Sequence, residues 1–156
     1  MQRADKEITS RAEIDAIINK AQVLRLALAV ESEPYVVPVS FGYDGSSLYF
    51  HTAQTGKKLD MLSVNNRVCF EVEGNVSLKR HAQEACKWSF LYTSVIGAGV
   101  VIELKGEDEK IQGLNAIMRH YSGADWSFKA EALKNTRVWR VAVESLTGKR
   151  SGEKMA

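Results

Sequence analysis

Six segments of the sequence carry strand-type patterns and are separated by short connections. Within them apolar side chains alternate with polar or small ones, or run almost unbroken, as in strands that bury one face of a sheet. The pair Asp44-Gly45 lies before one of them and is a hairpin signal. The segments are residues 23–30, 35–43, 48–51, 67–72, 88–104 and 138–146. So many strands with few helices predict a closed or nearly closed antiparallel barrel.

Helical patterns flank these strands. Ser10 followed by Glu13 is a capping-box signature before apolar residues at helical spacing. Thr55 is the expected N-cap of a second, short helix, and Gly123 stops a third. The three expected helices are residues 10–20, 58–65 and 107–122. We expect residues 124–136 to form an irregular loop or a short helix, and a polar tail from Thr147.

Composition favours one domain that spans residues 1–156, because 45% of the 156 residues are apolar and can fill one sizeable core. The formal charge of +2 is too small to indicate a nucleic-acid or membrane partner. Cys69 and Cys86 form no metal-ligand motif, and we expect Cys69 in the core. A charged N-terminus without a long apolar run predicts a soluble, cytoplasmic protein with no metal site.

An anion site is predicted in the connection between the third strand and the second helix. The first turn of a helix has unpaired backbone N–H groups and a partial positive charge, and this helix starts with Lys57 and Lys58. Thr52 and Thr55 add hydroxyl donors, and Gly56 allows close backbone approach. A phosphate fits such a site. A solvated loop followed by a basic surface helix explains the local pattern equally well.

Two strand features admit a ligand or a purely structural explanation. Arg25 lies in an apolar strand, so it needs an anion or several carbonyls unless it faces solvent. Gly97 and Gly99 fall on one face of a strand and leave it bare. Such a face indicates tight sheet curvature or a flat ligand, and curvature is the commoner cause.

Several runs of the sequence resemble the pyridoxamine 5'-phosphate oxidase-like flavoproteins, and within them the branch named for 5-nitroimidazole resistance. The runs are VLRLALAV, PYVVPVSFGYDGSSLYFHTAQTGKKLDML, NNRVCFEV, YTSVIGAGVV and VWRVAVESLTGKRS. The resemblance covers nearly the whole chain. It implies a mainly β fold with flanking helices: a six-stranded antiparallel split β-barrel of Greek-key type, with about three helices. It also implies flavin mononucleotide (FMN) bound at a homodimer interface.

The resemblance also assigns residues to the cofactor. Lys57 and Lys58 would hold the phosphate, Arg25 would line the flavin or its ribityl chain, and Ser94 would pass near it. His51 would contact the cofactor on its substrate side, and it is the one candidate catalytic residue, as a proton donor near neutral pH. The full set of expected cofactor-binding residues is Arg25, Leu26, Ala27, His51, Thr52, Lys57, Lys58 and Ser94.

Two departures narrow the expected function. We find no C-terminal arginine-rich segment for a vitamin substrate, and Gly97-Ala98-Gly99 does not open a helix as a nicotinamide-binding fingerprint does. The first hypothesis is an oxidoreductase that takes electrons from a reduced carrier such as NAD(P)H and reduces small electron-poor substrates such as nitroaromatics. The alternatives are a non-catalytic protein that stores, senses or carries flavin, and a barrel that binds deazaflavin or haem.

Overall fold

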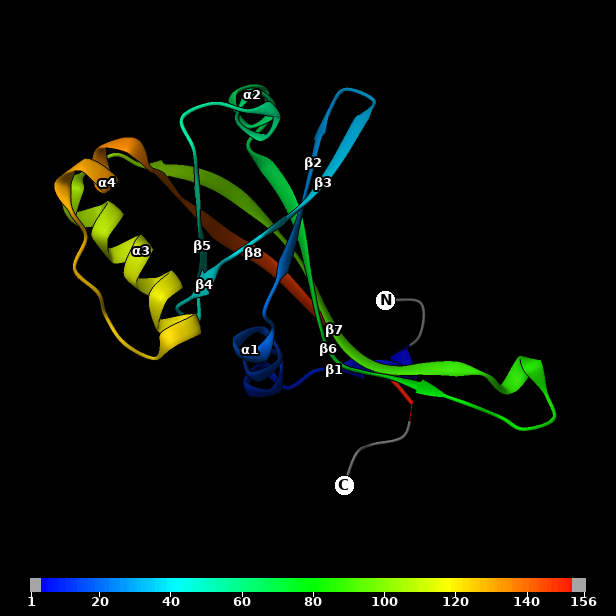
Figure 1. Ribbon diagram of the computed structural model, residues 1–156. Coiled ribbons are helices and arrows are strands. Elements are labelled where there is room, and N and C mark those ends of the chain that lie inside the picture. The colour runs from blue at the N-terminus through cyan, green and yellow to red at the C-terminus, as the bar shows by residue number, and fades with distance from the viewer. Residues whose placement is uncertain (1–3, 153–156) are drawn as a thin grey trace.

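One antiparallel sheet of eight strands forms the framework of the protein (Figure 1). The computed structural model describes residues 4–152. The strands are β1 (Glu7–Ile8), β2 (Leu24–Val30), β3 (Glu33–Val39), β4 (Gly42–Tyr43), β5 (Ser47–Thr52), β6 (Arg67–Lys79), β7 (Ser89–Leu104) and β8 (Arg137–Ser151). The helices are α1 (Arg11–Lys20), α2 (Lys57–Val64), α3 (Glu107–Ser122) and α4 (Ala130–Asn135), with short 3₁₀ turns at Ala4–Lys6 and Ala85–Lys87.

The predicted mainly β antiparallel fold is confirmed, but the predicted count of six strands is not. The described part of the chain has eight strands because β1 and β4, of two residues each, are separate elements. It has four α-helices rather than about three, since residues 130–135 form α4. The other six strands overlap the six predicted segments, but β3 ends at Val39 rather than at residue 43, and β6 and β8 continue to Lys79 and Ser151.

The sheet curls because two residues join its opposite edges. Its strands follow the order β3-β2-β6-β7-β8-β5-β4, and β1 adds to β8. β3 ends at Val39 and β4 begins at Gly42, so only Ser40 and Phe41 connect the two outermost strands. A link this short brings the edges close together. β3 and β4 do not pair with each other, so the sheet remains open, which is consistent with a split barrel.

The main core fills the inside of this curled sheet. Phe41, Phe50 and Phe70 are almost completely buried there, and α1 contributes Ile14, Ile17 and Ile18 from one face. The bare strand face predicted at Gly97 belongs to this core, where a Cβ would lie 2.3 Å from Phe70 Cζ. Gly97 is therefore explained by close packing of the curved sheet.

A second apolar layer forms where α3 packs on the other face of the sheet. Val138 is fully buried there, although its alternating position points away from the main core. α3 approaches β4 so closely that a Cβ on Gly42 would lie 2.2 Å from the backbone carbon of Ala116. Both faces of the β4–β5–β8 edge are thus covered.

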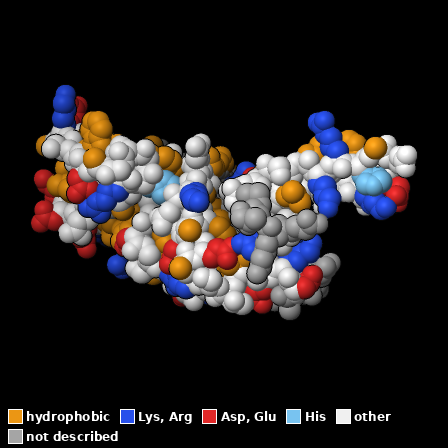
Figure 2. All heavy atoms as spheres, turned by 90° about the horizontal axis from the view of Figure 1, so that it is seen from below, with side chains coloured by type: hydrophobic (Ala, Val, Ile, Leu, Met, Phe, Trp, Pro, Cys, Tyr) orange, Lys and Arg blue, Asp and Glu red, His pale blue; other side chains and the backbone are white. Residues whose placement is uncertain are grey.

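The β6–β7 hairpin continues beyond the barrel as a long arm, formed by residues 75–90 (Figure 1). It begins at a register shift between Gly74 and Ser77, where Asn75 has a positive φ of 54°. Seen from below, the arm stands clear of the body and carries Lys and Arg side chains near its end (Figure 2). Trp88 and Phe90 are among its exposed apolar side chains.

Three local predictions were wrong. Thr55 does not cap α2, since the N-cap is Gly56, which makes no side-chain cap. The polar tail predicted from Thr147 is the last part of β8, because β7 is long enough to pair with it up to Ser151. Cys69 is exposed rather than in the core, since it lies on the outer face of β6.

Candidate functional site

Four residues, 53–56, separate the end of β5 from the start of α2, close to where the sequence predicted the helix. Gly56 has a φ of 140°, a conformation that favours glycine, and its carbonyl accepts hydrogen bonds from the N–H groups of Leu59 and Asp60. Leu59, Met61 and Leu62 are buried and fix the helix on the barrel. Within residues 4–152 the N–H groups of Lys57 and Lys58 have no hydrogen-bond partner. The helix therefore presents two free donors at its positive end.

The Lys57 side chain is held on the β3 side of this helix start. Its Nζ lies 2.6 Å from Glu33 Oε1 and 5.0 Å from the centre of the Tyr35 ring. The hydrogen bond to Glu33 raises the pKa of Lys57. Because both side chains are more than half exposed, at 52% and 62%, a stronger anion can compete for this ammonium group.

The Lys58 side chain lies on the other side, against β5. Its Nζ is 5.6 Å from the centre of the Phe50 ring, and burial lowers the pKa of Lys58. Partial burial and then the Lys58 charge lower the pKa of His51. His51 is therefore neutral near pH 7, and an anion beside Lys58 would relieve both groups.

Thr52 is already engaged by the protein. Its hydroxyl donates to the Ala53 carbonyl at 2.8 Å and accepts from Trp139 Nε1 at 3.0 Å. The link to Trp139 orients the end of β5 relative to β8. Thr52 can donate to a phosphate only by giving up the bond to Ala53.

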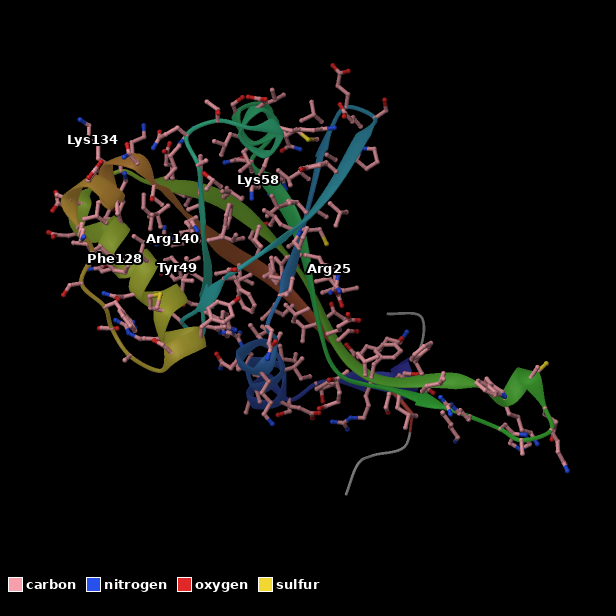
Figure 3. The ribbon with its side chains drawn as sticks, in the orientation of Figure 1. Arg25, Tyr49, Lys58, Phe128, Lys134 and Arg140 are labelled. Atoms are coloured by element: carbon pink, nitrogen blue, oxygen red, sulfur yellow. The ribbon has the colours of Figure 1, made fainter. Side chains whose placement is uncertain are left out.

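Arg25 finds its partners within the protein. Its guanidinium lies 3.3 Å from Glu71 Oε2 and 3.0 Å from Glu73 Oε1, both on the neighbouring β6. Burial raises the pKa of Glu71, and Arg25 opposes this shift. Figure 3 shows Arg25 where β2 crosses β6 and β7, well below Lys58 and α2. The structure does not bring Arg25 to the two lysines of the same chain.

The remaining predicted residues lie near Arg25 rather than near α2. Ala27 is half-buried on the outer face of β2, and Ser94 lines a pocket of about 380 Å³ with Glu71, Phe90 and Ile96. Leu26 is fully buried in the main core, so only its backbone can face a ligand. The predicted set thus divides into two groups. The α2 group comprises His51, Thr52, Lys57 and Lys58, and the outer-face group comprises Arg25, Ala27 and Ser94.

Sequence reasoning assigned no role to Arg140, a cation on the sheet face that carries His51. Arg140 lies on β8 directly opposite Tyr49, on the face of the sheet that also carries His51 (Figure 3). Its Nε is buried and has no hydrogen-bond partner in the part of the chain that the structure describes. Burial and a hydrogen bond to Asp44 raise the pKa of Tyr49 to about 12. A guanidinium inside the apolar VWRVAV run was the available signal.

Two other kinds of site find no support among residues 4–152. No group of three or more His, Cys, Asp or Glu side chains is arranged to hold a metal ion there. No helix in these residues has the length and apolar character needed to cross a membrane.

A family model described as pyridoxamine 5'-phosphate oxidase matches residues 10–150 of the chain. Among solved structures, a protein proposed as a 5-nitroimidazole antibiotic resistance protein, from Bacteroides thetaiotaomicron, is 33% identical. The match covers 94% of this chain and 90% of that one, with a TM-score of 0.81. A FAD-binding protein from Mesorhizobium loti is 26% identical, over 92% of this chain and 96% of that one, with a TM-score of 0.67.

Two more distant matches add less. A FAD and heme binding protein from Mycobacterium smegmatis is 21% identical over 95% of this chain and 74% of that one, with a TM-score of 0.83, which shows a shared fold. An uncharacterized protein of Rhizobium meliloti is 28% identical over 65 residues. This stretch spans 42% of either protein, so the match covers less than half of that curated relative.

Proposed function

Because the chain belongs to the pyridoxamine 5'-phosphate oxidase family, we propose that it binds FMN, with the phosphate at the start of α2. The observation that carries this proposal is the pair of unpaired N–H groups at Lys57 and Lys58, beside two ammonium groups. Backbone donors, a helix dipole and lysine charges are the usual partners of a phosphate.

The FAD-binding description of the Mesorhizobium loti protein supports a flavin in this chain as well. We favour FMN because one helix start provides one phosphate anchor. A bound flavin supplies reversible electron and hydride transfer, and the protein supplies its position and surroundings. His51 contributes a neutral imidazole beside the anchor, which suits hydrogen bonding to the cofactor or a proton relay.

We further propose that the cofactor site is completed between two copies of the chain. The α2 group and the outer-face group lie apart within one copy, and both are expected to serve one cofactor. Phe90 and Ile96, beside Ser94, are 54% and 51% exposed, which is costly unless something covers them. In a homodimer, the outer face of one copy can cover the cofactor anchored at α2 of the other.

The proposed activity is the reduction of small electron-poor substrates such as nitroaromatics, with NAD(P)H as electron donor. The description of the 33% identical protein supports this substrate class. The non-catalytic alternative is a protein that carries or senses flavin. Bleaching of the flavin absorbance by NAD(P)H, followed by its recovery on adding a nitro compound, would favour the enzyme. Flavin that stays oxidised with every donor would favour the alternative.

The test of the binding proposal combines mass spectrometry of the released cofactor with a double variant. Lys57→Ala with Lys58→Ala should reduce FMN affinity at least about tenfold, because each charge-assisted contact contributes about 1.5–3 kcal/mol before solvent screening. Lys129→Ala with Lys134→Ala removes two exposed lysines near α4 and should leave the flavin content unchanged. Equal flavin content in both double variants would remove the anchor from α2. Release of FAD, deazaflavin or haem would overturn FMN.

A further inference from the structure

A groove lies at the opposite end of the barrel from α2, between α1 and the base of the β6–β7 arm (Figure 1). Its volume is about 340 Å³, which is at the lower end of the range for small-molecule sites. None of the residues proposed to bind flavin lines it. Of its lining residues, only Tyr92 also lines the pocket at Ser94, so the groove is otherwise separate from the proposed cofactor site.

One face of α1 forms the first wall. Glu13, Ala16, Ile17 and Lys20 follow each other at helical spacing and all line the groove. Ala16 leaves room where a larger side chain would fill the space, and Ile17 gives an apolar floor. Lys20, at the end of the helix, has no hydrogen-bond or ion-pair partner in the described chain.

The strands at the base of the arm form the second wall. Leu91 extends the apolar floor, and Asn75 and Ser151 bring an amide and a hydroxyl to the rim. Neither of these two side chains is hydrogen-bonded to any residue between 4 and 152. Arg150 contacts Glu13 through one terminal nitrogen, Nη2. The groove thus combines an apolar floor, unpaired polar groups, and two cations against one carboxylate.

We propose that this groove binds a small organic anion with an apolar body, independently of the flavin site. The net positive charge and free donors select an anion, and the Ile17 and Leu91 side chains favour a ring or short aliphatic chain. Lys20 and the second face of the Arg150 guanidinium would hold the charged group. Asn75 and Ser151 would then supply neutral hydrogen bonds at the rim.

The experiment titrates the purified, cofactor-containing protein with phenyl phosphate and follows backbone amide signals by NMR. We expect saturable shifts at Asn75 and Ser151 in the range of about 10 mM probe or below. Benzyl alcohol, which has the ring without the charge, should bind at least about tenfold more weakly. Absence of saturable shifts at these residues, or equal binding of both probes, would overturn the proposal.

Matched variants separate the groove from the rest of the surface. Ala16→Trp fills the groove and should abolish the shifts, whereas Ala12→Trp, at an exposed position of α1 outside the groove, should retain them. Lys20→Glu should weaken binding at least about tenfold and Lys20→Arg should restore it. Flavin content should stay constant throughout, so loss of this site and loss of the α2 site are distinguishable. Equal binding by the two tryptophan variants would contradict the assignment.

Discussion

Lys57 Nζ and Glu33 Oε1 are 2.6 Å apart, so the tip of the β2–β3 hairpin places a carboxylate on the proposed phosphate anchor. The two residues are 24 positions apart in the sequence and meet because α2 packs beside β2, which forms a hairpin with β3. An incoming phosphate must compete with Glu33 for this ammonium group. The affinity for an anion is thus set by the hairpin as well as by the helix.

Replacing Glu33 should strengthen flavin binding. In Glu33→Gln the competing negative charge is gone, and since exposed pairs of this kind contribute about 0–1 kcal/mol, affinity for FMN should rise up to about fivefold. Fluorescence titration of the flavin-free protein measures this change. Glu31→Gln alters the charge of the same hairpin without touching Lys57 and should leave affinity nearly unchanged. Weaker binding in Glu33→Gln would show that Glu33 supports the site.

Removing the Lys58 charge should raise the pKa of His51 part of the way to its ordinary value. Burial is the larger cause of the lowered pKa and remains, while the repulsion by Lys58 disappears in Lys58→Gln. An NMR titration of the His51 ring measures the shift, with His51→Gln to assign the signal. Lys57→Gln is the matched control and should have no effect, because Lys57 is not among the causes. A shift of equal size in both variants would contradict the proximity of Lys58.

His51 should also make the protein less stable in mild acid. Its pKa is lower in the folded chain than the usual 6.5, so below about pH 6.5 the unfolded chain binds a proton first, which lowers the free energy of the unfolded state. The free energy of unfolding should therefore fall as pH drops through 6.5, and this part of the fall should be absent in His51→Gln. Urea unfolding between about pH 5 and 8 measures it. Identical pH profiles of the two proteins would refute this prediction.

Gly42 should tolerate no side chain. A Cβ there would lie within 2.4 Å of the α3 backbone at Ala116 and Ile117, so Gly42→Ala must push α3 off the sheet at a cost of about 1–3 kcal/mol. Thermal and urea unfolding measure the loss. Gly106→Ala, at the N-cap of α3, meets only the flexible side chain of Glu109. Its loss of unfolding free energy should be a few tenths of the loss in Gly42→Ala. Equal losses of unfolding free energy in the two variants would contradict a close contact between Gly42 and the α3 backbone.

Tyr121 should stabilise the link between the two sheet edges. Its hydroxyl donates to the Gln22 carbonyl at 2.8 Å and accepts from the N–H of Phe41 at 3.1 Å. Tyr121→Phe leaves that buried N–H unpaired, which should cost about 1–3 kcal/mol of unfolding free energy. Tyr35→Phe removes a hydroxyl that makes no hydrogen bond within the described chain and serves as control. Similar stabilities of all three proteins would mean that water replaces the lost partner.

Local patterns predicted much of this fold. Each strand has its own alternation of apolar and polar residues, and each long helix has its own capping residues. Ser10 and Gly123 bound α1 and α3 as expected, since caps act on their neighbours in sequence. Thr55 failed as a cap because its neighbour Gly56 adopts a conformation that residue type alone does not reveal. Val138 is buried although its position in the alternation of β8 points away from the main core, because α3, which is distant in sequence, covers that face.

The candidate site was predicted only in part, because local patterns do not reveal contacts between residues that are distant in sequence. Lys57 and Lys58 follow β5 directly, so their placement at a helix start needed no long-range contact. Glu33 contacts Lys57 only because α2 packs on strands that are distant in sequence. No sequence pattern predicts that contact. Arg25 was visible in the sequence as a charged residue in an apolar run. Its carboxylate partners on β6 were not predictable, because they depend on strand register, which is set by turn lengths and by pairing between distant strands.

The link Ser40–Phe41 joins the outermost strands of the sheet, so it fixes the positions of both sheet edges relative to each other. A nick by a protease at this point would let β3 and β4 move apart, and their outer edges, which do not pair with each other, would become accessible to neighbouring molecules. Circular permutants that place new termini there should consequently self-associate, whereas new termini in the β6–β7 arm would leave both edges intact.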